Sequence, residues 1–139
     1  MKITKKKVAD LDRLDFLPKH IGNHFAQFEN YIYKLADNHV AEYKGGYWEF
    51  YELSNGGFYM SLASEESFSF ENPNNYCSMQ QLDSETISII LNLYALSNFS
   101  MMLYQKGIDN DKPAIGYHVL RDYAALEHEH ASIIMKAID

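Results

Sequence analysis

The stretch that decides the fold is YKGGYWEFYELSNGGFYM, residues 43–60. Beyond its first two glycines, apolar Trp48 and Phe50 alternate with residues of the opposite face. That opposite face carries Tyr47, Glu49 and Tyr51. Residue-by-residue alternation is typical of a β-strand with one buried face. We therefore expect Trp48 and Phe50 to point into the core and the two tyrosines to point outward.

A turn follows this strand at SNGG, residues 54–57. Asn and Gly tolerate positive φ, so we expect Asn55, Gly56 and Gly57 to adopt it in a tight turn. FYMSLA then resumes an extended pattern, which predicts a hairpin. A third run, SFSFE at residues 67–71, predicts an edge strand that completes an antiparallel meander.

Helical patterns flank these strands on both sides. Residues 23–39 carry apolar side chains at helical spacing and predict an amphipathic helix. Residues 10–19 lead into it, and we expect an irregular arm anchored by apolar side chains. These anchors are Leu11, Leu14, Phe16 and Leu17.

A long segment without charge, residues 86–105, follows Asp83, a good N-cap residue. It has the length of a membrane span, but Ser88 and Asn92 interrupt it, which favours a buried central helix. Pro113 opens a final helical region. The chain is thus predicted to be a single α+β domain, residues 1–139, with a small three-stranded antiparallel meander packed against about four helices.

Charge limits the partners of the protein. The 139-residue chain has a net charge of −7, and four of its 12 basic residues are Lys2, Lys5, Lys6 and Lys7. Beyond residue 7, eight basic residues face 19 acidic ones, which disfavours strong duplex DNA binding. Residues 1–10 are expected to be a flexible basic tail. The absence of a signal pattern and the lone Cys77 favour a cytoplasmic protein without a membrane span.

Potential metal ligands concentrate at Glu127, His128, Glu129 and His130. On one helix, His128 and His130 would diverge by roughly 200° and could not share a metal. The pairs at helical ligand spacing are His118 with Asp122 and His20 with His24, and neither has a third ligand nearby in sequence. We therefore expect a solvated polar helix face and no metal site.

No catalytic motif is present in the sequence. It contains neither a G-x-S-x-G elbow nor a phosphate-binding glycine loop, and Cys77 lies in a polar segment with no histidine beside it. We expect an inert thiol, no catalytic residue, no cofactor and no enzymatic activity.

Residues 43–60 closely resemble the signature Y-x-G-G-Y-W-x-F-Y-x-L-S-N-G-G-F-Y-M of ArdB/KlcA antirestriction proteins. Supporting segments occur in family order: FLPKHIG at 16–22, LYALSNFS at 93–100, LRDYA at 120–124 and AID at 137–139. The segment EHEHAS at 127–132 departs from the His-Pro-Glu-Ala pattern of the family, so we expect a less kinked last helix.

The resemblance implies inhibition of type I restriction-modification systems, which protects incoming plasmid or phage DNA carried by mobile elements. The implied partner is the type I restriction enzyme or its DNA complex. Acids scattered among tyrosines favour an inhibitor that does not mimic DNA. We expect the partner to contact Tyr47, Glu49, Tyr51 and Asp139.

Two alternatives remain open from the residues alone. One is a nucleic-acid-binding accessory module that uses the lysine tail and the outward tyrosines. The other is a metal-dependent hydrolase that uses His118, His128 or His130 with neighbouring carboxylates.

Overall fold

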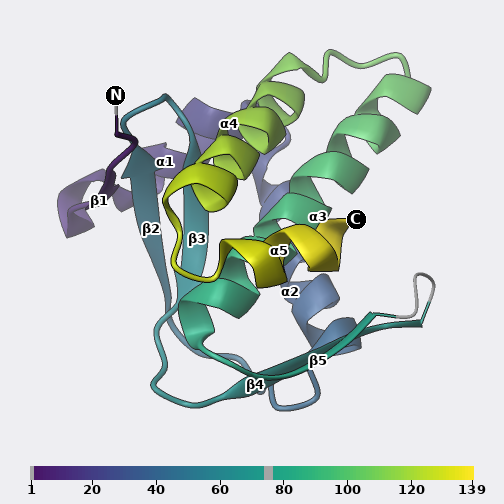
Figure 1. Ribbon diagram of the computed structural model, residues 1–139. Helices are drawn as coiled ribbons and strands as arrows, with labels where there is room; N and C mark the ends of the chain where they lie inside the picture. Colours follow the sequence, from purple (N-terminus) through teal and green to yellow (C-terminus); the bar gives the residue numbers. More distant parts are fainter. Residues whose placement is uncertain (1, 74–76) are drawn as a thin grey trace.

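The computed structural model describes residues 2–73 and 77–139, with Cys77 described by its backbone alone. The thiol of Cys77, predicted to be inert, therefore lies outside the described residues. The elements are β1 Lys5–Lys7, a 3-10 helix Asp10–Asp12, α1 Arg13–Ile21, α2 Phe25–His39, β2 Trp48–Leu53, β3 Phe58–Leu62, β4 Phe68–Asn72, β5 Cys77–Leu82, α3 Ser84–Gln105, α4 Asp111–Glu127 and α5 Ala131–Ile138. The predicted α+β class is confirmed (Figure 1).

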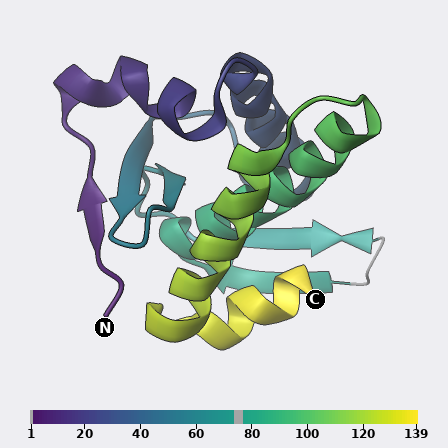
Figure 2. The ribbon, with the colours of Figure 1, turned by 90° about the horizontal axis from the view of Figure 1, so that it is seen from above.

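Two antiparallel sheets form, and their strand pairing differs from the predicted meander. One sheet has the order β1-β2-β3, and β4 pairs with β5 in a separate ribbon. Both views show this ribbon apart from the three-stranded sheet (Figures 1 and 2). The predicted hairpin is correct, with Trp48 opposite Leu62 and Tyr51 opposite Tyr59. The predicted third strand exists, but its assignment to the hairpin sheet is wrong.

Helix α3 explains why β4 does not pair with β3. Its buried side chains Ser84, Ser88 and Asn92, spaced four residues apart, face the edge of β3. The backbone N–H of Met60 donates to Asn92 Oδ1 at 3.0 Å, and Asn92 Nδ2 donates to the Met60 carbonyl at 2.7 Å. The N–H of Leu62 donates to Ser88 Oγ at 2.9 Å, and the Ser84 hydroxyl donates to the Leu62 carbonyl. These bonds occupy the edge that a further strand would need.

The opposite edge of the sheet is closed by the basic N-terminal segment. Lys5, Lys6 and Lys7 form β1, opposite Leu53, Glu52 and Tyr51. The Val8 N–H donates to the Phe50 carbonyl at 2.8 Å and extends the pairing. The prediction of a flexible tail is therefore wrong for this segment, because backbone pairing with β2 holds it in place.

Residues 10–21 are helical, where we expected an irregular arm. Pro18 lies inside α1, yet Phe16, Leu17 and Ile21 are buried on one face of the helix. Phe16 stacks on Phe50 with a centroid distance of 4.5 Å. This packing outweighs the hydrogen bond that proline removes from the helix. Two of the four predicted anchors are wrong, since Leu11 and Leu14 are 94% and 90% exposed.

The hairpin turn needs positive φ at one residue and not at three. Gly56 has φ +91°, whereas Asn55 and Gly57 do not adopt positive φ. Gly57 is required by space instead, because a Cβ there would lie 2.9 Å from Val119 Cγ2. The Asn55 side chain accepts from the Gly57 N–H at 3.0 Å and donates to the Val119 carbonyl at 2.8 Å. The turn is therefore docked on α4.

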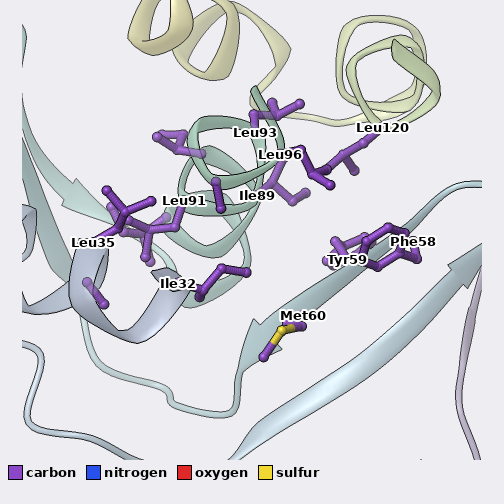
Figure 3. Packing of buried hydrophobic residues seen from close by; sticks show 14 of the residues in the cluster. Ile32, Leu35, Phe58, Tyr59, Met60, Ile89, Leu91, Leu93, Leu96 and Leu120 are labelled. Carbon is purple, nitrogen blue, oxygen red and sulfur yellow. The ribbon is translucent and has the colours of Figure 1, made fainter. Parts of the chain in front are cut away.

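Helix α3 forms the centre of the core. Asp83 caps it as predicted, accepting from the Thr86 N–H at 2.7 Å. Among the described helices, α3 alone is long and apolar enough to cross a membrane, with a mean hydropathy of 1.4, but 67% of that window is buried in the protein. It packs against α2, α4, α5 and β3. Figure 3 labels α3 side chains of this core, Ile89, Leu91, Leu93 and Leu96, together with core side chains of the neighbouring α2, β3 and α4: Ile32, Leu35, Phe58, Tyr59, Met60 and Leu120.

The final helical region is two helices, because the chain leaves α4 at His128 and begins α5 after His130. The expectation of a less kinked last helix is wrong. Ile134 and Ala137 are buried in α5, so the bend allows α5 to pack against α3.

Replacing Asn92 with leucine tests the closure of the β3 edge. The variant Asn92→Leu keeps the size of the side chain but leaves the N–H and C=O of Met60 without partners in the interior. We expect the free energy of unfolding to fall by about 2 to 5 kcal/mol in urea titrations. The control Asn98→Leu lies at an exposed position on the same helix and should stay within about 0.5 kcal/mol of the parent. Equal stability of both variants would contradict the closure.

Candidate functional site

The outer face of β2 and β3 is the floor of an open groove of about 670 Å³. This face carries two cross-strand pairs, Tyr51 opposite Tyr59 and Glu49 opposite Ser61. The groove is lined by these strands, the following loop and the start of α3: Glu49, Tyr51, Ser61, Leu62, Ala63, Ser64, Glu65, Glu66, Ser84 and Glu85. We call this surface the outer-face groove. The alternation correctly places Glu49 and Tyr51 on it.

A stack of three tyrosines connects the floor of the groove to α4. Tyr59 is fully buried, with its ring centroid 5.1 Å from Tyr51 and 6.2 Å from Tyr123. Burial raises the pKa of Tyr59, and the nearby Glu85 carboxylate raises it further. Tyr51 is half-buried rather than freely exposed. It is therefore both a structural contact and part of the groove wall.

Glu85 is the electrostatic centre of the site. Its Oε1 lies 2.9 Å from His128 Nε2, and its Oε2 lies 2.5 Å from Lys5 Nζ. The hydrogen bond from His128, helped by Lys5 and opposed by burial, lowers the pKa of Glu85 to about 2. His128 Nδ1 accepts from the His130 N–H at 3.0 Å, so the ring donates to Glu85 from Nε2. Glu85 is thus held ionised between two donors.

Glu49 forms a second ion pair at the other end of the floor. Its Oε2 lies 3.1 Å from Lys7 Nζ and accepts from the Tyr51 hydroxyl at 3.1 Å. Burial raises the pKa of Tyr51, and the hydrogen bond to Glu49 adds to the effect. Tyr51 is therefore a neutral donor at physiological pH.

The four predicted contact residues do not form one cluster. Glu49 and Tyr51 lie together, but Tyr47 does not line the groove. It is 54% exposed, with the Arg13 guanidinium 4.7 Å from its ring centroid. Asp139 follows α5 as its C-cap residue, and the C-terminus lies apart from β2 in both views (Figures 1 and 2).

The histidines separate into different environments. His20 lies 2.7 Å from Glu52 and stacks on Phe58, and burial lowers its pKa. His118 is exposed on α4. His128 and His130 lie in a turn, so the helical argument for their divergence is wrong. Over residues 2–73 and 78–139, the acidic and histidine side chains that gather as potential metal ligands are Asp83, Glu129 and His130.

Sequence reasoning missed the partners that complete the groove: Lys5, Tyr59, Glu85, Tyr123 and His128. Tyr59 had a usable signal, because two-residue periodicity continued across the turn places it beside Tyr51. Glu85 was visible as an acid in the first turn of a helix, but nothing local linked it to the tail or to residue 128.

Comparison with known proteins connects this arrangement to a family. Residues 41–139 match the family described as antirestriction protein. The chain belongs to this family. Antirestriction protein KlcA of Escherichia coli is 34% identical over 140 residues, spanning 99% of this chain and 94% of the relative. A second Escherichia coli KlcA is 33% identical over 139 residues, spanning 99% and 95%.

The family match extends to the three-dimensional fold. A solved structure from work on the KlcA and ArdB proteins superposes with a TM-score of 0.86 at 31% identity, covering 100% of this chain and 96% of the other. That work describes a novel fold and antirestriction activity against type I DNA restriction systems in vivo but not in vitro. The edge closure and the groove are therefore features of a chain with the antirestriction fold.

Alanine substitution of Tyr47 and of Tyr51 should show which of the two rings contributes to folding stability and which is only a surface group. Tyr51→Ala removes the stack on Tyr59 and should lower the free energy of unfolding by about 1 to 3 kcal/mol. Tyr47→Ala removes an exposed ring and should change it by about 0.5 kcal/mol or less. Chemical denaturation of both variants measures the difference. A Tyr47→Ala loss as large as that of Tyr51→Ala would refute this assignment of roles.

Neutralising Glu85 tests the charge network. Glu85→Gln retains the shape of the side chain but loses the charge that Lys5 and His128 both contact. We expect a loss of about 1 to 2 kcal/mol in the free energy of unfolding at pH 7. Glu71→Gln, the same exchange at an exposed position of β4, is the matched control and should be near neutral. Equal free energies of unfolding for Glu85→Gln and Glu71→Gln would show that the charge network does not contribute to folding stability.

Proposed function

We propose that this chain is an antirestriction protein that protects incoming plasmid or phage DNA from type I restriction-modification systems. The observation that carries the proposal is the coincidence of sequence and fold with the KlcA and ArdB structure over the whole chain. In this proposal residues 1–139 act as one cytoplasmic domain. The protein works by binding and not by catalysis.

The charges of the groove argue against DNA mimicry. Duplex DNA carries one charge per about 1.7 Å of its axis, so a mimic needs a row of uncompensated acids. Of the four groove acids, Glu49 is paired with Lys7 and Glu85 with Lys5, which leaves the adjacent loop residues Glu65 and Glu66 rather than a long row of acids. Each pair removes a negative charge from the surface that a mimic would display. We infer that the protein does not inhibit the restriction enzyme by occupying its DNA-binding channel in place of DNA.

The same pairs weaken the nucleic-acid-binding alternative. The ammonium groups of Lys5 and Lys7 are paired with Glu85 and Glu49, which reduces the positive charge that they offer to phosphates. Of the three histidines in the hydrolase alternative, only His130 belongs to the ligand cluster of the described residues, whereas His118 is exposed on α4 and His128 is bonded to Glu85.

We propose that the partner is the type I enzyme or its DNA complex, contacted through Glu49 and Tyr51 in the groove and through Tyr47 outside it. Exposed aromatic rings beside hydrogen-bonding groups are frequent anchors of protein interfaces. Asp139, at a distance from the groove, would make a separate contact. The activity of the solved relatives in vivo but not in vitro supports a mechanism that needs another component of the cell.

Phage plating tests this function. In a host that carries a type I system, expression of this protein should raise the plating efficiency of unmodified phage toward that of an isogenic host without the system. Phage already modified by the system is the control, and its plating should not change. Glu49→Gln should reduce protection, whereas Glu71→Gln, outside the groove, should retain it. Undiminished restriction in cells that contain soluble, folded protein would overturn the proposal.

A further inference from the structure

A second polar cluster lies where the start of α3 meets the turn between α4 and α5. Asp83, Glu129 and His130 each offer one potential ligand atom, and the three atoms lie within 4.8 Å of one another. His130 Nε2 lies 3.5 Å from Asp83 Oδ2 and 3.7 Å from Glu129 Oε1. The outer-face groove and the proposed antirestriction function use none of these three side chains.

These separations match the edges of a metal coordination shell. Zinc binds imidazole nitrogen and carboxylate oxygen at about 2.0 to 2.2 Å in tetrahedral geometry. Two ligands on such a tetrahedron are about 3.4 Å apart, as follows from those bond lengths. The two measured distances to His130 Nε2 lie within a few tenths of an ångström of that value. Small side-chain rotations would therefore bring the three donors onto one ion.

Other bonds hold the side chain of one ligand, Asp83, and the backbone of a second, His130. Asp83 caps α3 with Oδ1, which accepts from the Thr86 N–H at 2.7 Å and leaves Oδ2 for the cluster. His130 is fixed through its backbone N–H, which donates to His128 Nδ1 at 3.0 Å. Its carbonyl accepts from the Ile134 N–H at 3.1 Å at the start of α5. The Asp83 side chain and the His130 backbone are thus held before an ion arrives, which lowers the entropic cost of binding.

The charge of the cluster is compatible with a bound cation. With a neutral imidazole, Asp83 and Glu129 leave two negative charges close together, and their side chains are 52% and 79% exposed. The positive end of the α3 dipole favours Asp83 as an anion through its capping oxygen. One imidazole with two carboxylates suits zinc and neighbouring transition metals better than magnesium or calcium, which prefer all-oxygen shells.

We propose that Asp83, Glu129 and His130 form a binding site for a divalent transition-metal ion of the zinc type, with its remaining coordination position open to solvent. The ion would join the α4–α5 turn to the N-terminus of α3. The sequence alone concealed this site, because Asp83 lies far from residues 129 and 130 along the chain and the latter were expected on a helix. The proposal is independent of the antirestriction function.

Zinc titration of the full-length, untagged protein by calorimetry at pH 7.5 tests the site. We expect saturable binding of one equivalent of zinc. Asp83→Asn is the informative variant, because asparagine still caps a helix but lacks the carboxylate charge. It and His130→Ala should each weaken the affinity by about tenfold or more. The control His118→Ala removes an exposed histidine outside the cluster and should leave the affinity unchanged.

The same samples give a second readout in thermal melting. Zinc should raise the melting temperature of the parent and of His118→Ala, since an ion that binds only the folded state stabilises it. It should raise that of Asp83→Asn much less. If His130→Ala does not fold, the comparison of Asp83→Asn with the parent decides alone. The proposal fails if the parent shows no saturable binding up to about 100 µM zinc, or if Asp83→Asn binds as tightly as the parent.

Discussion

The fold depends on the hydrogen bonding of one strand edge. Strand β3 is fully buried along its length, so the N–H and C=O groups of Met60 and Leu62 cannot turn to water. Helix α3 supplies side-chain partners through Ser84, Ser88 and Asn92. A helix that closes a strand edge must lie against the sheet, and α3 accordingly carries apolar side chains on its other sides. The remaining helices then pack around it.

The other edge of the sheet is closed by β1, a strand of three lysines. The lysine side chains determine the charge of the groove. Alternation sends Lys5 and Lys7 to the outer face, where they meet Glu85 and Glu49. Backbone pairing thus delivers positive charge to a face rich in carboxylates. The result is a polar groove in which the two acids on its floor and at the start of α3, Glu49 and Glu85, are paired with lysines, which suits recognition of a protein surface better than imitation of a phosphate backbone.

Local sequence patterns correctly predicted those elements whose structure depends on neighbouring residues in the chain. The hairpin, α2 and the cap of α3 each follow from side-chain periodicity or from one capping residue. Strand partners do not: the β1 sequence KKK has no hydrophobic signal, and its role exists only beside the open edge of β2. Likewise Glu49 and Tyr51 share a strand and were found together, whereas Glu85, Tyr59 and Tyr123 meet only through tertiary packing.

Glu85 shows how closely the groove is coupled to the edges of the sheet. It follows Ser84, which bonds to β3, and it accepts from Lys5 of the strand that closes the opposite edge. Its third contact, His128, comes from the turn that sends α5 back onto α3. The position of this one half-buried carboxylate therefore depends on the elements that close both sheet edges and on the turn before the last helix. Because those elements define its position, the shape of the groove is a consequence of how the sheet is closed and not an independent surface feature.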